Sequence, residues 1–417
     1  MHYYSAFFNN ICTVTMHIYI FLQKNKVMES LIATYKALLK QEHSDFVRYM
    51  HDRINWNNRL IGIVGPRGVG KTTLIIQHII NNLNADECLY VNADDFYFSS
   101  NKIVDLANNF SNIGGKYLFI DEIHKHDEWA RELKLIYDYH PDLHVVFSGS
   151  SILDITKGAN ADLSRRAVIY KMQGLSFREY LKLFHNIDSR VFSLAEVLEN
   201  KVELDKGVRP LQYFKQYLKN GYYPFALNDD YKSRLQAVVN QTLESDIPQY
   251  ANMHASTSRK LRQLLAIISQ NVPFKPNMKT IGESLGVSRN NVADYLLYIE
   301  QAGLISQLRD GTGGIRSLAK VDKVYLDNTN LMHLLNYGEP NNGNVRETFF
   351  MNQLRVDNDP IASSTADFQV GEFTFEVGGK NKGKKQIQSV ANGFVVKDDI
   401  EYGALNTIPL WTFGMLY

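Results

Sequence analysis

The segment "GPRGVGKTTL" (65–74) constrains this chain most, because its glycines, lysine and threonine have a fixed spacing. Gly65, four residues, and then Gly70, Lys71 and Thr72 match the phosphate-binding-loop pattern G-x-x-x-x-G-K-[ST]. The apolar run 59–64 before it predicts a buried strand, and the run 72–83 after it predicts a helix. Strand, loop and helix in this order predict an α/β fold with a parallel sheet and a polyphosphate site.

The residue types of this loop suit phosphate chemistry. Its glycines let backbone N–H groups turn toward an anion at a helix N-terminus. We expect Lys71 to neutralise the β- and γ-phosphates of ATP and the Thr72 hydroxyl to ligate Mg²⁺. The expected nucleotide contacts are Gly65, Pro66, Arg67, Gly68, Val69, Gly70, Lys71, Thr72 and Thr73.

A second stretch, "YLFIDEIHK" (117–125), predicts an apolar strand that ends in two carboxylates. We expect Asp121 to hold the Mg²⁺ shell and Glu122 to accept a proton from the attacking water. Small-molecule kinases need no such glutamate, and small GTPases usually have D-x-x-G here. The pair therefore favours an enzyme that hydrolyses ATP to ADP and phosphate.

The third strand, "HVVFSGSS" (144–151), ends in small hydroxyl residues that suit a γ-phosphate sensor. We select Ser148, with Ser150 and Ser151 as alternatives, although serines at strand ends are also common turn formers. Arg165 and Arg166 precede a further predicted strand. One of them can stabilise transition-state charge in its own or a neighbouring subunit, or both can be solvated surface residues.

These motifs together resemble the prokaryotic AAA+-like P-loop ATPases, through "RLIGIVGPRGVGKTTLI", "YLFIDEIHKHDEWARELK", "VVFSGSS", "SRRAVIYKMQGLSFREYL" and "SDIPQYAN". The resemblance spans roughly 28–417. It implies an α/β P-loop core, a helical region, a winged-helix module and a C-terminal domain similar to restriction-endonuclease folds. By position, it implies a nucleotide set of Lys71, Thr72, Asp121, Glu122 and Ser148. Arg166 matches the family's arginine, but Arg165 stands where the family usually has glycine.

The resemblance also maps a nuclease-type site onto the C-terminal domain. Nucleases of the PD-(D/E)xK type hold Mg²⁺ with an Asp and a Glu, which here are Asp367 and Glu376, with Glu347 in the preceding helix. These nucleases have a lysine two residues after that Glu, and this position is Gly378 here. The nuclease alternative therefore requires Lys380, two residues further on, to substitute through the geometry of the loop. We therefore favour a degenerate domain that binds rather than cuts.

Residues 278–305 have the pattern of a helix-turn-helix. Gly286 is expected to end one helix and Ser288 to cap the next, which would expose Arg289, Asn290, Asn291 and Asp294. A glycine-rich hairpin, a possible wing, follows at 306–320. Residues 259–323 hold ten Lys or Arg against five Asp or Glu, an excess that suits duplex DNA. Winged helices also bind proteins or serve as ATPase lids, so all three uses stay open.

The region between these modules reads as helices. We expect a helical lid in which Tyr222, Tyr223 and Phe225 are core residues, and a helix stopped at Pro248. His124 and His126 lack further Cys or His neighbours for a zinc site, and we expect both on the surface.

Bulk properties indicate several domains without a dominant charge. Lys and Arg number 45 against 44 Asp and Glu, so no global field points to nucleic acid or membrane. Cys12 and Cys88 form no disulfide framework, and the apolar run 11–22 is shorter than a spanning helix. We expect a cytoplasmic protein, without a membrane partner, that forms a homo-oligomer or binds a protein partner.

The expected domains follow the motifs. They are an uncertain N-terminal extension, either an over-called start or a disordered tail (1–27), an AAA-type P-loop core (28–185), a helical lid or linker (186–255), a winged helix (256–325) and a small α/β domain (326–417).

Three functions compete. An ATP-hydrolysing switch with a DNA- or partner-binding arm is the leading interpretation. An ATP-gated nuclease and a protein-interaction scaffold with little turnover are the alternatives.

Overall fold

The computed structural model describes residues 28–41, 45–149, 163, 165–251, 253, 255–311, 320–336 and 338–417. Three sequence predictions fall outside these residues: the N-terminal extension 1–27, the alternative sensors Ser150 and Ser151, and the tip of the glycine-rich hairpin (312–319).

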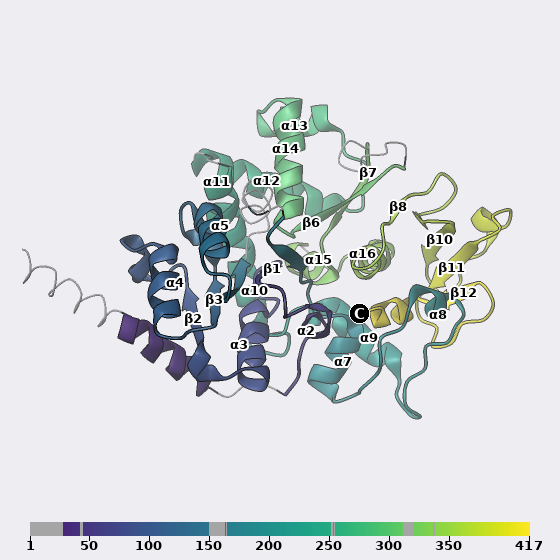
Figure 1. The fold of residues 1–417 in the computed structure, drawn as a ribbon. Helices are drawn as coiled ribbons and strands as arrows, with labels where there is room; N and C mark the ends of the chain where they lie inside the picture. The colour runs from purple at the N-terminus through teal and green to yellow at the C-terminus, as the bar shows by residue number, and fades with distance from the viewer. Residues whose placement is uncertain are drawn as a thin grey trace, which may run out of the picture.

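A five-stranded sheet forms the centre of the N-terminal part, in the order β2–β3–β4–β1–β5 (Figure 1). All neighbouring strands in it are parallel. The strands are β1 (Leu60–Val64), β2 (Cys88–Asn92), β3 (Tyr117–Asp121), β4 (His144–Gly149) and β5 (Val168–Lys171). Every residue of β1 is buried, as expected for a central parallel strand whose two faces are covered. The predicted α/β class is confirmed.

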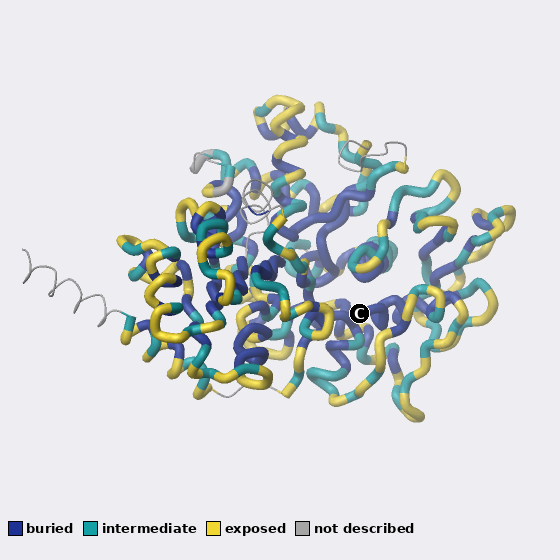
Figure 2. Tube along the Cα trace, viewed as in Figure 1, coloured by how far each residue is buried: buried dark blue, intermediate teal, exposed yellow. Residues whose placement is uncertain are grey.

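Helices cover this sheet. They are a helix over 28–39, α2 (Met50–Arg53), α3 (Lys71–Asn82), α4 (Ile103–Asn112) and α5 (Trp129–Tyr139). In α4 the buried residues are Ile103, Leu106, Ala107 and Phe110, a spacing that places them on one face. Figure 2 shows the consequence, a buried sheet beneath helices whose outer surfaces are exposed.

The next segment is helical and consists of α7 (Phe177–His185), α8 (Leu194–Leu198), α9 (Pro210–Asn220), α10 (Tyr231–Gln241), a π-helical turn (Thr242–Asp246) and α11 (Ile247–Tyr250). The expected stop at Pro248 is wrong. Pro248 lies in the first turn of α11, directly after the π-helical turn. A proline is tolerated there, because N–H groups of a first turn need no partner within their own helix.

The predicted helix-turn-helix pattern folds into α12 (Ala255–Asn271), α13 (Met278–Leu285) and α14 (Arg289–Gln301). Gly286 ends α13 with a φ of 61°, and the Ser288 side chain caps α14 by accepting from the Asn291 N–H. The antiparallel strands β6 (Ile305–Arg309) and β7 (Val321–Leu326) follow. The winged-helix assignment itself stays a prediction.

The C-terminal part has a second sheet, in the order β12–β11–β10–β9–β8. Its elements are α15 (Thr329–Leu335), α16 (Asn342–Leu354), β8 (Ile361–Ala362), β9 (Phe368–Val370), β10 (Phe373–Gly378), β11 (Gly393–Lys397), β12 (Thr407–Pro409) and a 3₁₀ turn (Leu410–Met415). β10 and β11 are parallel, as are β11 and β12, and the other pairs are antiparallel.

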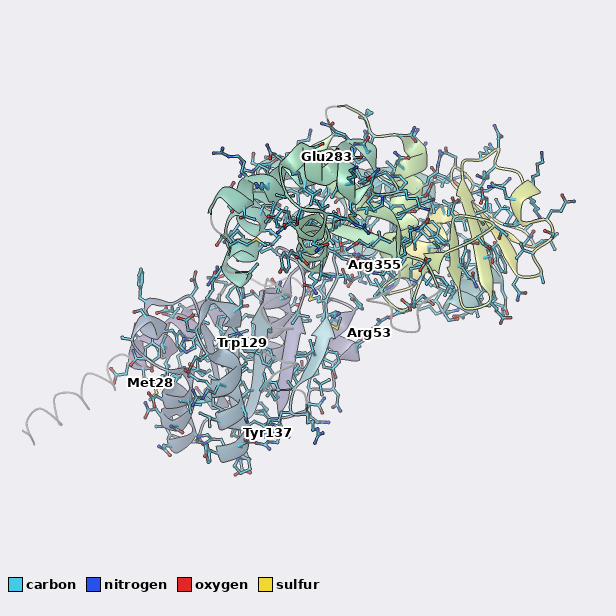
Figure 3. The ribbon with its side chains drawn as sticks, turned by 90° about the horizontal axis from the view of Figure 1, so that it is seen from above. Met28, Arg53, Trp129, Tyr137, Glu283 and Arg355 are labelled. Carbon is cyan, nitrogen blue, oxygen red and sulfur yellow. The ribbon has the colours of Figure 1, made fainter. Side chains whose placement is uncertain are left out.

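Arg53 and Arg355, both labelled in Figure 3, each pair with an aspartate of the C-terminal part, and the pair of Arg53 joins that part to the first sheet-containing part. Arg53, next to the first sheet, binds both carboxylate oxygens of Asp357 at 2.6 and 2.8 Å. Arg355, just after α16, binds Asp327 at 2.6 Å. The carbonyl of Tyr417 accepts a hydrogen bond from the Ser176 hydroxyl at 2.6 Å, so the last residue lies against the start of α7.

Candidate active site

The loop between β1 and α3 has the conformation that its glycines allow. Gly68 and Gly70 have φ values of 78° and 97°, in the left-handed region where a side chain would be strained. Gly65 is required for another reason, since a Cβ atom there would collide with the carbonyl oxygen of Met172. The loop therefore turns tightly over the carboxyl end of β1 and directs the N-terminus of α3 at the same space.

Lys71, the first residue of α3, folds back into this loop. Its ammonium donates to the carbonyl oxygens of Gly65 and Pro66, both at 2.8 Å, and the residue is 6% exposed. Burial lowers the pKa of Lys71 to about 8. The ammonium is thus held directly by neutral carbonyls, and an anion in the loop would place an opposite charge in contact with it.

Asp121, at the end of β3, gathers polar groups from four elements. One carboxylate oxygen accepts from the Thr72 hydroxyl and the other from the Ser148 hydroxyl. Tyr90 on β2 adds a hydrogen bond at 2.7 Å and the Glu122 N–H one at 2.9 Å. The structure therefore brings together Thr72, Asp121 and Ser148, which the sequence had placed on three different elements. Tyr90 was not predicted, because no motif marks β2.

This oxygen-rich group is chemically suited to Mg²⁺. A threonine hydroxyl and an aspartate carboxylate meet beside the phosphate-binding loop, and Mg²⁺ prefers oxygen ligands of this kind, completed by water and phosphate. Thr72 and Asp121 are the residues that would hold the ion.

Glu122 lies at a turn in the left-handed region, with a φ of 51°. Its carboxylate is 3.5 Å from a guanidinium nitrogen of Arg67 and 3.5 Å from Nε2 of His124. Glu122 lines a cleft of ≈ 390 Å³ together with Arg67, Gly68, Gly70, Lys71, Thr72, Thr73, Pro224, Phe225 and Asn228. The acid expected to activate water thus faces the same space as the lysine expected to bind phosphate.

Two predictions near this cleft need correction. The His124 side chain is 0% exposed and not on the surface, because the 3₁₀ turn that holds it (Ile123–Lys125) packs against β4. Burial lowers the pKa of His124 to about 4. His126 is largely covered and lies 3.0 Å from Glu132. Tyr222 and Tyr223 are core residues as predicted, but Phe225 is only partly buried, lines the cleft and packs over Gly68.

Arg48 supports the loop from behind and was missed by sequence reasoning. Its guanidinium binds both carboxylate oxygens of Glu179 at 3.0 Å and donates to the carbonyl oxygens of Gly174 and Val69. Both side chains of the pair are buried. Because an unpaired buried charge is costly, this pair fixes the loop firmly against α7. No local pattern around Arg48 signals the role.

The arginines before β5 lie away from this cleft. Arg166 binds both carboxylate oxygens of Asp138 at 2.9 and 3.1 Å, and Arg165 is exposed. Since β5 is parallel to β1, residues before β5 lie at the amino edge of the sheet, opposite the loop. The structure does not bring Arg166 to the nucleotide loop of its own chain.

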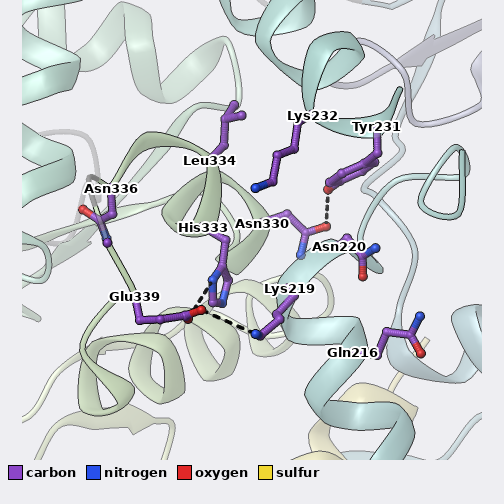
Figure 4. Close-up of a pocket in the computed structure, with 11 residues that line it drawn as sticks. Gln216, Lys219, Asn220, Tyr231, Lys232, Asn330, His333, Leu334, Asn336 and Glu339 are labelled. Carbon is purple, nitrogen blue, oxygen red and sulfur yellow. Dashed lines mark hydrogen bonds and ion pairs between the residues drawn. The ribbon is translucent and has the colours of Figure 1, made fainter. Parts of the chain in front are cut away.

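A larger cleft of ≈ 740 Å³ lies among α9, α10 and α15 (Figure 4). There Glu339 pairs with Lys219 at 3.5 Å and with His333 at 3.7 Å, and the Tyr231 hydroxyl donates to Asn330 at 2.8 Å. Its lining residues include no glycine-rich loop and no adjacent acid pair at a strand end. It therefore has none of the chemistry that the sequence motifs predict.

The C-terminal carboxylates also lie near one another. Lys323 bridges Glu347 at 3.2 Å and Asp367 at 3.6 Å, and the pKa of Glu347 is raised by burial and by Asp367. Glu376 is 1% exposed and its Oε1 pairs with Lys382, whereas its Oε2 has no hydrogen-bond partner among the residues that the structure describes. Lys382, and not Lys380, pairs with Glu376.

Comparisons with known proteins agree with the loop and the sheet. Residues 57–181 match the family model of an AAA domain (AAA_14), and residues 211–341 match a domain of unknown function (DUF8612). Two uncharacterized proteins of Methanocaldococcus jannaschii, MJ1637 and MJ1544, are 25% and 24% identical over 320 and 311 residues. These alignments cover 69% and 72% of this chain and 67% of each relative.

Solved structures with some similarity include RuvB of Thermotoga maritima, at 17% identity and a TM-score of 0.31. The alignment covers 67% of this chain and 89% of the RuvB chain. The S. cerevisiae Hsp104–ADP complex has 15% identity and a TM-score of 0.30, covering 64% and 41%. C. elegans PCH-2 has 16% identity and a TM-score of 0.23, covering 67% of each chain. Within the described residues, no helix is both long and apolar enough to cross a membrane.

Proposed function

We propose that this protein binds ATP with Mg²⁺, hydrolyses it to ADP and phosphate, and uses the cycle as a conformational switch. One observation carries the proposal: Thr72, Ser148 and Asp121 meet beside a loop that encloses Lys71, while Glu122 faces the same cleft. These are the groups needed to bind a triphosphate and to direct water at its last phosphorus.

Each residue has a separate task in this proposal. The loop N–H groups and Lys71 bind the phosphates, and Lys71 exchanges its two carbonyl contacts for phosphate oxygens. Thr72 and Asp121 hold Mg²⁺, which when bound supplies positive charge beside the phosphates. Glu122 accepts the proton of the attacking water, and Ser148 orients Asp121 through its hydroxyl.

Ligand-linked stabilisation tests the binding step. ATP with Mg²⁺ should raise the melting temperature of the wild-type chain, because a ligand that binds only the folded state stabilises it. Lys71→Ala should abolish this shift. The matched control is Lys182→Ala. It removes a lysine of α7 that pairs with Asp188 away from the cleft, and it should leave the shift intact. An equal ATP-induced shift in wild type and Lys71→Ala would refute the assignment of the loop.

The helix-turn-helix region supports a DNA-binding arm as part of the switch. Arg289, Asn290, Asn291 and Asp294 are exposed on α14, and Arg289 is its first residue. An exposed first turn with an arginine suits contact with a phosphate or a guanine edge. The alternative for the arm is a protein partner on the same surface. The alternative for Arg166 is a homo-oligomer in which it reaches a neighbour's nucleotide.

A nuclease is the second candidate, favoured by the acids Glu347, Asp367 and Glu376 and by the unpartnered oxygen of Glu376. Lys323 and Lys382 neutralise these acids in the structure, which favours the degenerate interpretation. Plasmid nicking with Mg²⁺, with and without ATP, separates the two. Nicking that Glu376→Gln abolishes would establish the nuclease, whereas intact plasmid leaves the switch as the proposal.

A further inference from the structure

Arg67, inside the phosphate-binding loop, is shared between two carboxylates. Its Nε is 3.2 Å from one oxygen of Asp246, and a terminal nitrogen is 3.3 Å from the other. A terminal nitrogen also lies 3.5 Å from Glu122. Arg67 lines the nucleotide cleft beside Lys71 and Thr72. The guanidinium is thus at the cleft and at the same time occupied by acids of this chain.

Asp246 comes from outside the sheet. It lies in the π-helical turn between α10 and α11, is 2% exposed, and has Lys125 as a second cation at 3.7 Å. A buried carboxylate needs such partners, because burial without them would disfavour its charged form. The Asp246–Arg67 pair therefore ties the helical segment to the phosphate-binding loop.

The position of Glu122 indicates where the last phosphate would lie. A base that activates water for hydrolysis must face the γ-phosphate, so a guanidinium nitrogen 3.5 Å from Glu122 is next to that phosphate's place. Arginine binds phosphate and carboxylate with the same planar, two-pronged geometry. A γ-phosphate and Asp246 would accordingly compete for one guanidinium, and ADP would not enter this competition.

From this arrangement we propose that Arg67 is a γ-phosphate contact supplied by the chain's own loop, and that Asp246 holds it while the site is empty. The inference rests on the proposed function and adds a sensor to it. ATP draws Arg67 from Asp246 and releases Glu122 from its ion pair. Among the described residues, Asp246 then keeps its ion pair with Lys125, so the helical segment from α10 to α11 is the part that responds to ATP rather than ADP.

Two variants should change ATP affinity in opposite directions. We measure, by calorimetry with Mg²⁺, the affinity of the full chain for ADP and for a non-hydrolysable ATP analogue. Arg67→Ala should lower the affinity for the analogue by about ten- to a hundredfold, the usual effect of losing a charge-assisted hydrogen bond. The affinity for ADP should stay nearly unchanged. Asp246→Asn should raise the affinity for the analogue several-fold, because Arg67 is no longer held by a negative charge. The affinity for ADP should again stay unchanged.

The matched control uses another Arg–Asp pair of the same helical segment. Arg234 binds Asp230 at 2.7 Å at an exposed position on α10, so Asp230→Asn should alter neither affinity. Retained ADP binding reports that each variant is folded. If Asp246→Asn does not fold, Lys125→Gln replaces it. That variant leaves Arg67 as the ion-pair partner of Asp246 among the described residues, so binding of the analogue should weaken while ADP binding stays unchanged.

The outcomes separate this inference from the function on which it rests. If Arg67→Ala lowers the affinities for ADP and for the analogue equally, Arg67 is a structural residue of the loop and the inference is overturned. An unchanged or weakened analogue in folded Asp246→Asn would overturn it as well. If the wild type binds neither nucleotide, the proposed function falls together with the inference.

Discussion

At the scale of single residues, the charged side chains of the site already have hydrogen-bond or ion-pair partners within the chain. Lys71 contacts two carbonyls, Asp121 contacts three hydroxyls, and Arg67 lies between two acids. These side chains are therefore already held in place before a nucleotide binds. Binding exchanges contacts within the chain for contacts with phosphate, which limits the cost of ordering side chains.

The lowered pKa of Lys71 predicts that ATP binding weakens as pH rises. In the empty loop burial holds this pKa at about 8, whereas bound phosphate favours the ammonium form and raises it. Above pH 8 the free protein loses a proton that the complex retains, so affinity should fall by up to about tenfold per pH unit. Calorimetry from about pH 7 to about pH 9.5 should also detect proton uptake in this range. Constant affinity with no proton uptake would contradict the role of Lys71.

Sequence reasoning found those residues whose partners belong to motifs. It failed where a partner is distant in the chain: Arg48 and Glu179 are 131 residues apart, and Arg67 and Asp246 are 179 apart. No local pattern encodes such pairs, because they depend on how whole elements pack. The same reason explains His124, which is buried beneath a site built partly by Asp246 and the π-helical turn.

At the scale of elements, strand β1, the loop and helix α3 follow the sequence closely, because each has a local signal in apolar run, glycine spacing and periodicity. The same holds for α13 and α14, whose ends are set by Gly286 and Ser288. The break expected at Pro248 failed, since the π-helical turn that precedes it has no recognisable signature. Lys382 replaced Lys380 because the turn after β10 decides which lysine points at Glu376.

The exposed start of α14 makes a prediction for the arm. Arg289→Ala should weaken duplex DNA binding by about 1–3 kcal/mol if Arg289 contacts a base. If it contacts a phosphate, affinity should fall for all sequences alike, and the salt dependence should flatten. ATP hydrolysis without DNA should survive, because α14 contributes no residue to the nucleotide cleft. The absence of salt-sensitive DNA retention by the wild type at low ionic strength would end the DNA interpretation.

At the scale of the whole molecule, the nucleotide cleft is assembled from parts that can respond to it. Glu122 lines it from the end of β3, and Phe225 lines it from the segment after α9. The π-helical turn reaches it indirectly, because Asp246 pairs with the lining residue Arg67. Arg53, labelled in Figure 3, ties α2 to the C-terminal part through its ion pair with Asp357. A change at the phosphates thus has direct contacts through which it can reach the helical segment, which is the structural requirement for a switch.

Steady-state phosphate release by the full chain, with ATP and Mg²⁺, tests the central claim most directly. Glu122→Gln keeps the size of the side chain but cannot accept the water's proton. It should still bind ATP and release phosphate about 10²–10⁴-fold more slowly than wild type. Glu128→Gln, which changes an exposed glutamate paired with Arg131, is the matched control and should release phosphate at the wild-type rate. A wild type without turnover, or a Glu122→Gln variant as fast as wild type, would contradict the account.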